Sequence, residues 1–85
     1  MEGYNDIVLA NGERHACSAV LTAGNSPSMY IDLPGMTLSD AARIFSNSDN
    51  TNTMSWAGRV YTGWTNMIML TAQPYGVEVT LRRNA

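Results

Sequence analysis

Hydrophobic and polar positions alternate over most of the chain, which is the period of a β-strand with one buried face. The first two such runs are residues 4–9 and 13–23. Between them stands Asn11-Gly12, a dipeptide typical of a tight type I′ turn, in which both central residues take positive φ. The pattern therefore predicts a β-hairpin at the start of the chain.

Further runs with the same period follow, separated by turn-forming residues. They predict strands at residues 29–33, 53–56, 59–72 and 77–83. A turn is expected at Ala57-Gly58, and Gly63 inside the longest run is typical of a bulge or bend. The last run alternates most cleanly, so we expect Val77 and Leu81 to point into the core.

One stretch changes period and predicts a helix. Thr37 is a good N-cap, and Asp40 three residues later favours the positive end of a helix dipole. Apolar residues then recur at i, i+3, i+4 and i+7, which places them on one face of the helix. These residues are Leu38, Ala41, Ala42 and Phe45. We expect this stripe to pack on the sheet.

Residues 46–53 are wholly polar and form a segment longer than most helix-to-strand connections. Such a segment is either a binding loop or slack chain, and Asp49 and Asn50 are its candidate partner-binding residues. Asn47, Asp49 and Thr51 alternate oxygen ligands as a calcium loop does. The segment has one carboxylate and lacks the central glycine and terminal glutamate, so strong calcium binding is not expected.

The predicted elements follow the order β-β-β-α-β-β-β. This order indicates an α+β protein with a single antiparallel sheet and one short helix packed on one face. A chain of 85 residues suffices for one core, so we expect a single domain over residues 1–85.

Charge and composition exclude several classes of function. The net charge is −2, lysine is missing and most arginines are scattered, so the chain lacks the clustered cations that nucleic acids or anionic membranes require. No window approaches the roughly 18 apolar residues of a membrane-spanning helix, and the first residues lack a signal-peptide pattern. We therefore expect a cytoplasmic protein with no direct nucleic-acid or membrane partner. Charged residues make up only 14% of the chain, a surface that tolerates contact with another protein.

His15 and Cys17 are the residue types that carry chemistry in many enzymes, and they stand two positions apart on one predicted strand face. That spacing could present a nucleophile with its base, or two metal ligands. Catalysis also needs an orienting group and an oxyanion site, and zinc needs further ligands, which no motif supplies. The favoured interpretation is a core cysteine and a histidine at the sheet margin. We expect no enzymatic activity, no metal and no cofactor.

Residues 56–64 concentrate aromatic and cationic side chains. The cluster comprises Trp56, Arg59, Tyr61 and Trp64. Residues of these types are enriched at interface hot spots, and one short helix cannot cover both faces of the predicted sheet. The alternative is that the rings pair across strands and seal the uncovered face. The face with Arg59 and Tyr61 is the predicted contact surface, either for a foreign protein or for a second copy in a homodimer.

Four segments carry a resemblance that covers most of the chain. They are "DIVLANGE", "MTLSDAARIFSN", "GRVYTGWT" and "VEVTLRR". Their layout resembles short uncharacterised proteins encoded by bacteriophages and prophages of gut Firmicutes. The resemblance implies a phage or mobile-element origin and an unassigned role. Small phage proteins of this size and acidity include inhibitors of host defence proteins, of the anti-CRISPR type, which act in the host cytoplasm, and tail or head accessory proteins of the virion. A small-ligand or nucleotide-binding protein is the third class that stays open.

Overall fold

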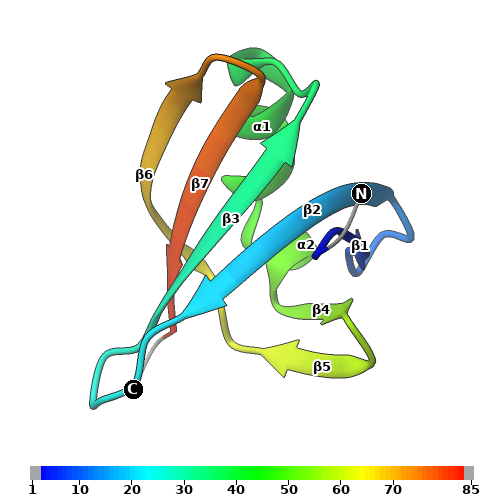
Figure 1. The fold of residues 1–85 in the computed structure, drawn as a ribbon. Coiled ribbons are helices and arrows are strands. Elements are labelled where there is room, and N and C mark those ends of the chain that lie inside the picture. The colour runs from blue at the N-terminus through cyan, green and yellow to red at the C-terminus, as the bar shows by residue number, and fades with distance from the viewer. Residues whose placement is uncertain (1–2, 84–85) are drawn as a thin grey trace.

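Seven strands and two helices make up the computed structural model, which describes residues 3–83 (Figure 1). Residues 1–2 and 84–85 lie outside this description, and so does part of the N-terminal segment considered above for a signal peptide. The elements are β1 (Asn5–Val8), β2 (Arg14–Leu21), β3 (Ser28–Pro34), α1 (Leu38–Phe45), α2 (Ser48–Thr51), β4 (Thr53–Trp56), β5 (Arg59–Thr62), β6 (Asn66–Gln73) and β7 (Gly76–Arg82). All strands join one antiparallel sheet in the order β5-β4-β1-β2-β3-β7-β6, which confirms the predicted α+β class.

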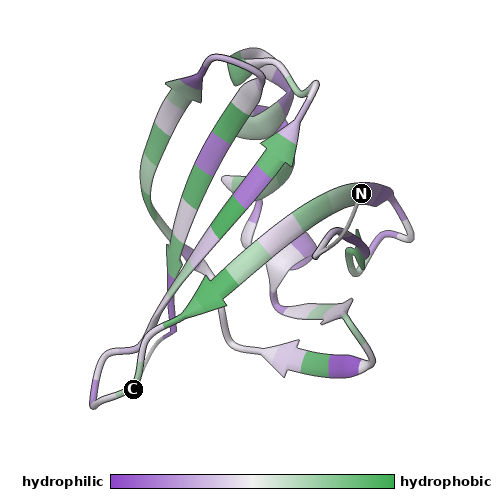
Figure 2. Ribbon diagram, in the orientation of Figure 1, coloured by the Kyte–Doolittle hydropathy of each residue, from purple (hydrophilic) through white to green (hydrophobic). Residues whose placement is uncertain are grey.

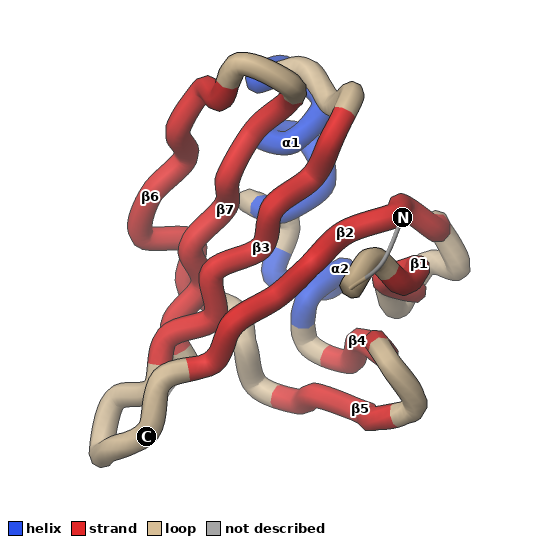
Figure 3. Tube along the Cα trace, in the orientation of Figure 1, coloured by secondary structure: helices blue, strands red, loops and turns tan. Residues whose placement is uncertain are grey.

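Strand β2 joins two parts of the sheet, because its two halves have different neighbours (Figure 3). β1 pairs with residues 14–17 of β2, whereas β3 pairs with residues 18–21. The sheet continues through β4 and β5 on one side and through β7 and β6 on the other. The two parts diverge from β2 in Figure 1, so the sheet is strongly bent, and both parts contribute to a single core.

The inner face of the sheet carries this core. Directly paired residues of neighbouring strands lie on the same face. The central inner pairs, all at most 1% exposed, are Met29–Leu81, Ile31–Val79 and Leu33–Val77. Figure 2 shows the resulting alternation as hydrophobic and hydrophilic bands along β3 and β7. The inward positions predicted for Val77 and Leu81 are confirmed.

Helix α1 begins where the sequence predicts. The Thr37 hydroxyl accepts a hydrogen bond of 3.1 Å from the backbone N–H of Asp40, as an N-cap does. The helix lies against β6 and β7, and in Figure 1 it lies behind the sheet. It therefore covers only the inner face of these strands.

The buried face of α1 differs from the predicted stripe. Ala41, Ile44 and Phe45 are buried, whereas Leu38 keeps 45% of its surface exposed. The stripe is confirmed at Ala41 and Phe45 and wrong at Leu38, because the helix is rotated about its axis. This rotation buries the large Ile44 side chain more completely than the small Ala42, which removes more apolar surface from water.

The first hairpin is closed by a different turn from the one predicted. Gly12 has φ +88°, but Asn11 does not have positive φ, so the type I′ prediction for Asn11-Gly12 is wrong. The N–H of Leu9 donates to Glu13 O and the N–H of Gly12 donates to Leu9 O, both at 2.9 Å. This is the three-residue hairpin loop with glycine in the left-handed region. The Asn11 side chain stabilises it by accepting a bond of 3.0 Å from the N–H of Glu13.

The turn between β4 and β5 has the geometry expected of a type I′ turn. Trp56 and Arg59 form the last pair of the two strands, and Ala57 and Gly58 between them have φ +52° and +80°. The predicted turn at Ala57-Gly58 is therefore confirmed. Alanine is an unfavourable residue for the left-handed region, so Ala57 is a strained position.

The long strand predicted over residues 59–72 is wrong, because the chain leaves the sheet at Gly63. Gly63 has φ +81°, which ends the extended conformation, and its N–H donates to Asn52 O at 3.1 Å. The two pieces become β5 and β6, which lie at opposite edges of the sheet. The register irregularity itself lies further on, between Met67 and Met69.

Candidate functional site: a groove along the edge strand β5

A groove of about 320 Å³ lies along β5, where the bend of the sheet brings this edge strand close to the end of β2 and to the end of β7. We call it the edge groove. Its lining residues are Leu21, Pro27, Val60, Tyr61, Thr62, Trp64 and Arg83. They come from three distant parts of the sequence, so only the folded chain brings them together.

Two exposed apolar side chains stand in the lining of the edge groove. Val60 is 68% exposed and Leu21 is 40% exposed, a large apolar surface to leave in water. Trp64 is only 4% exposed and belongs to the core, and Tyr61 packs against the same core. The buried Trp64 ring and the half-buried Tyr61 ring anchor this part of the lining to the core, while Val60 and Leu21 offer surface that a ligand could cover.

The free edge of β5 also presents backbone N–H and C=O groups. Residues of an antiparallel pair alternate between those that exchange backbone hydrogen bonds with the neighbouring strand and those that do not. The bond from Gly63 N–H to Asn52 O sets this alternation, so Tyr61 exchanges bonds with β4. The N–H and C=O of Val60 and Thr62 therefore point away from β4. An edge with outward-pointing groups of this kind is a template for an added strand.

Positive charge flanks the groove at both ends of β5. Arg83 lines it, and the N–H of Arg83 donates to Pro27 O at 3.2 Å, which fixes the chain after β7 to the loop before β3. Arg59 is exposed at the start of β5. Within residues 3–83, neither guanidinium takes part in an ion pair. A segment with a carboxylate near either end would find a partner here.

The structure separates the four residues of the predicted aromatic cluster. Tyr61 and Trp64 both line the edge groove. Trp56 is half-buried, and its indole N–H lies 3.1 Å from Cys17 O and 3.2 Å from Asn5 O, so it ties β4 to β1 and β2. Met54 lies on the same face of β4 as Trp56 and is buried, so this face points inward. Arg59 and Tyr61 pair with Trp56 and Met54, respectively, and therefore lie on the inward face of the β4–β5 hairpin. The outward face carries Val60, which the sequence analysis did not identify as a contact residue. Its position next to Tyr61 in an alternating strand places it on the opposite face.

The other two predicted contact residues lie outside the groove. The segment 46–53 is not an irregular loop but contains α2, with Asn47 as its N-cap accepting from the N–H of Asp49. Asp49 is exposed on this turn of helix. Asn50 is 7% exposed, and its side-chain amide donates to Ile44 O at 3.2 Å. The backbone carbonyl of Asn50 accepts a hydrogen bond from the N–H of Ala10, so Asn50 holds the helices to the first hairpin.

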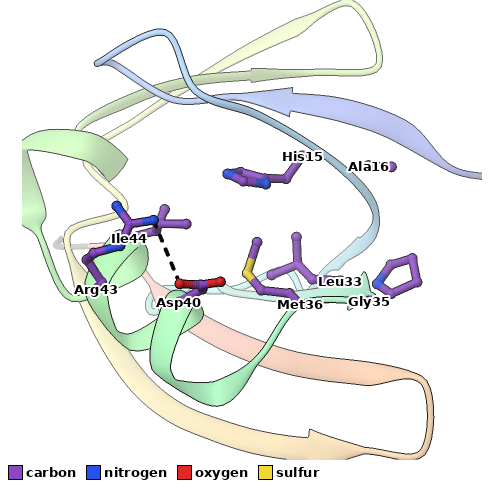
Figure 4. A pocket seen from close by; sticks show the side chains of 9 residues that line it. His15, Ala16, Leu33, Gly35, Met36, Asp40, Arg43 and Ile44 are labelled. Carbon is purple, nitrogen blue, oxygen red and sulfur yellow. Dashed lines mark ion pairs between the residues drawn. The ribbon is translucent and has the colours of Figure 1, made fainter.

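A second, smaller cleft of about 190 Å³ lies between α1 and the start of β2 (Figure 4). Glu13 joins its walls: its carboxylate lies 3.2 Å from His15 Nε2 and 3.5 Å from Arg43 Nη1. These contacts, led by the hydrogen bond to His15, lower the pKa of Glu13. The Asp40 carboxylate lies 4.0 Å from Nη2 of Arg43. Two carboxylates thus neutralise the arginine, and the cleft offers no free positive charge to an anionic ligand.

His15 and Cys17 do not form a reactive pair. The Cys17 side chain is fully buried, and burial raises the pKa of its thiol to about 12. A protonated, enclosed thiol is a poor nucleophile and a poor metal ligand. His15 faces Glu13 instead. Within residues 3–83, no three His, Cys, Asp or Glu side chains come close enough to hold a metal ion. Cys17 as a core residue is confirmed, while the lack of enzymatic activity stays a prediction.

Comparison with known proteins finds no match among family models, curated protein sequences or solved structures. In the part of the chain that the structure describes, neither helix has the length and apolar character needed to cross a membrane. What supports a function is thus the geometry of the described residues themselves.

Proposed function

We propose that this chain is a non-enzymatic protein-binding module that takes an extended segment of its partner as an added strand at β5. The observation that carries the proposal is the edge itself. Val60 and Thr62 direct main-chain groups away from β4, beside a groove with exposed apolar surface. Strand addition uses both features, since main-chain bonds supply affinity and side-chain pockets supply specificity.

The lining of the groove defines the kind of segment that fits. Val60 and Leu21 favour an apolar side chain on the segment, and Arg83 favours a carboxylate close to it. The proposed ligand is therefore an extended peptide with alternating apolar residues and at least one acidic residue.

The proposed partner class comes from the resemblance to phage proteins. We propose a bacterial defence protein, which the chain inhibits by occupying one of its segments, as an anti-CRISPR protein would. A phage structural protein is the alternative, because subunits of a particle also join through sheet edges. Both partners would use the same edge, so a test of the edge applies to both.

The test compares two substitutions at one position against a displayed library of short random peptides. Val60→Pro removes an outward-pointing N–H, and proline is tolerated on an edge strand where that N–H has no partner in the sheet. Val60→Thr keeps the N–H and the branched shape and is the matched control. Wild type should select extended peptides, Val60→Pro should bind them at least about tenfold more weakly, or 1.4 kcal/mol, and Val60→Thr should bind within a few-fold.

Both variants must give the wild-type circular dichroism spectrum for the comparison to count. Equal binding by Val60→Pro and wild type would contradict strand addition at β5. Failure of the wild-type chain to select any peptide would contradict the proposal as well.

A further inference from the structure

The outer face of β2, β3, β7 and β6 is a second surface, separate from the edge groove. It faces the viewer in Figure 1, with α1 on the opposite side. One row of paired residues crosses all four strands on this face. The row is Val20–Tyr30–Thr80–Met69. None of these residues lines the edge groove.

Three of the four residues in this row are large hydrophobic residues with exposed side chains. Val20 is 65% exposed, Tyr30 40% and Met69 58%, while Thr80 in the middle is 3% exposed. Ile68, beside the register irregularity of β6, adds another exposed apolar side chain at one end. Exposed apolar side chains gathered on one face of a small protein are typical of an interaction site.

Charges of opposite sign lie on the two sides of the row. Asp32 and Glu78 form the neighbouring pair toward one end of the strands. Arg82 lies toward the other end, two residues beyond Thr80, just as Glu78 lies two residues before it. Within residues 3–83, neither Arg82 nor Glu78 takes part in an ion pair, whereas Asp32 accepts a hydrogen bond of 3.2 Å from the Tyr4 hydroxyl.

We infer that the occupant of this face is a second copy of the chain, packed face to face about a two-fold axis that runs along the apolar row. Rotation by half a turn about such an axis leaves each position along the row unchanged and reverses the strand direction. Thr80 then faces Thr80, and Arg82 of one copy lies over Glu78 of the other. The face is therefore complementary to itself, as a two-fold interface requires.

The charge pattern selects this arrangement over the others. A foreign partner would have no need for acid and base to be placed symmetrically about Thr80. A copy packed without reversal of the strand direction would set Arg82 against Arg82 and Glu78 against Glu78, which is unfavourable. Only the reversed arrangement covers the apolar row and pairs both charges at once.

Charge exchange between Glu78 and Arg82 tests the interface, with the mass in solution measured by sedimentation or light scattering. Wild type should be a dimer. Glu78→Arg and Arg82→Glu alone should each weaken dimerisation by tenfold or more, because each places like charges in contact twice. The double exchange should restore the dimer. An equimolar mixture of the two single variants should form a mixed dimer, since both of its contacts join opposite charges.

Asp49→Arg, an equal charge change on the exposed surface of α2, is the control and should leave the dimer intact. Every variant must first show the wild-type circular dichroism spectrum. A wild-type mass of one chain, or of more than two, would overturn the inference. So would single exchanges that leave the mass unchanged, or a double exchange that stays monomeric. Loss of the dimer in Val60→Pro but not in Glu78→Arg would assign self-association to the β5 edge instead. Because the two surfaces share no residue, failure here leaves the edge groove untouched.

Discussion

Replacing Phe45 by alanine tests how the core is built, because Phe45 is the largest fully buried side chain of α1. Truncating a buried phenylalanine removes its apolar contacts and leaves a cavity, which together cost about 3–5 kcal/mol. The whole free energy of unfolding of a chain of 85 residues is about 4–13 kcal/mol. Phe45→Ala should therefore remove a large share of the stability and lower Tm by roughly 12–40 °C.

Two further positions on the same helix make this experiment decisive. Leu38 keeps 45% of its surface exposed, so Leu38→Ala loses about half a side chain of burial, about 1 kcal/mol, and leaves no closed cavity. Ile44 is fully buried, so Ile44→Ala should cost about 2–5 kcal/mol. A helix rotated to bury Leu38, as the periodicity alone predicts, would reverse this order.

Urea unfolding followed by tryptophan fluorescence measures all three variants. Trp64 is buried and Trp56 is half-buried, so both report the loss of the core. The variants must be compared at one protein concentration, because self-association adds to apparent stability. A Leu38→Ala variant that loses as much stability as Ile44→Ala would contradict the observed rotation of α1. So would a Phe45→Ala variant that loses less than about 1 kcal/mol with an unchanged m-value.

Three more predictions concern single positions. Ala57→Asn should raise the free energy of unfolding by up to about 1 kcal/mol, because asparagine accepts the left-handed φ of +52° more readily than alanine. Thermal unfolding measures this change, and a loss of stability would contradict the turn assignment. Thr51→Val should also stabilise by about 1 kcal/mol in urea unfolding, since the buried Thr51 hydroxyl has no hydrogen-bond partner within residues 3–83; destabilisation would mean that it has one. Cys17 should resist thiol reagents at pH 8 until the chain is unfolded, and rapid labelling of the native chain would contradict its burial. Because burial raises the pKa of its thiol from 9.0 to about 12, the stability of the chain should fall as the pH rises above 9.0, and Cys17→Ala should lose less stability in that range.

The parts of the fold that follow from local sequence were predictable. Alternation alone identifies Ile31 and Val79 as core positions, because a strand with one covered face leaves no other period. Thr37 is identifiable as an N-cap because its hydroxyl needs only the N–H of Asp40, three residues away. These features depend on neighbours in the chain.

Features that depend on competition between conformations or on distant contacts were not predictable. Asn11 suits a type I′ turn, but its side chain bonds to the N–H of Glu13 and stabilises a longer loop. The sequence predicts a turn at Ala57-Gly58 but not the positive φ of Ala57, which arises because the paired strands on both sides require a tight turn. By intrinsic propensity, asparagine takes positive φ more readily than alanine, yet here Ala57 has positive φ and Asn11 does not. The pairing of the strands therefore decides.

The candidate site was predictable only in part, for the same reason. Tyr61 and Trp64 stand out as aromatic residues near each other in the sequence. Leu21 and Arg83 join them only because Gly63 ends β5 and the bend in the sheet brings β5 toward the end of β2. No pattern within a short window of sequence contains that contact.

Amide hydrogen exchange at three consecutive residues of β5 shows whether this edge is free and whether a bound peptide pairs with it. In the free chain, the N–H of Tyr61 should exchange slowly because it bonds to β4, while those of Val60 and Thr62 should exchange rapidly. Addition of a peptide selected from the library should slow Val60 and Thr62 and leave Tyr61 unchanged. Slow exchange at Val60 and Thr62 before peptide is added, or rapid exchange after it is bound, would contradict strand addition at β5.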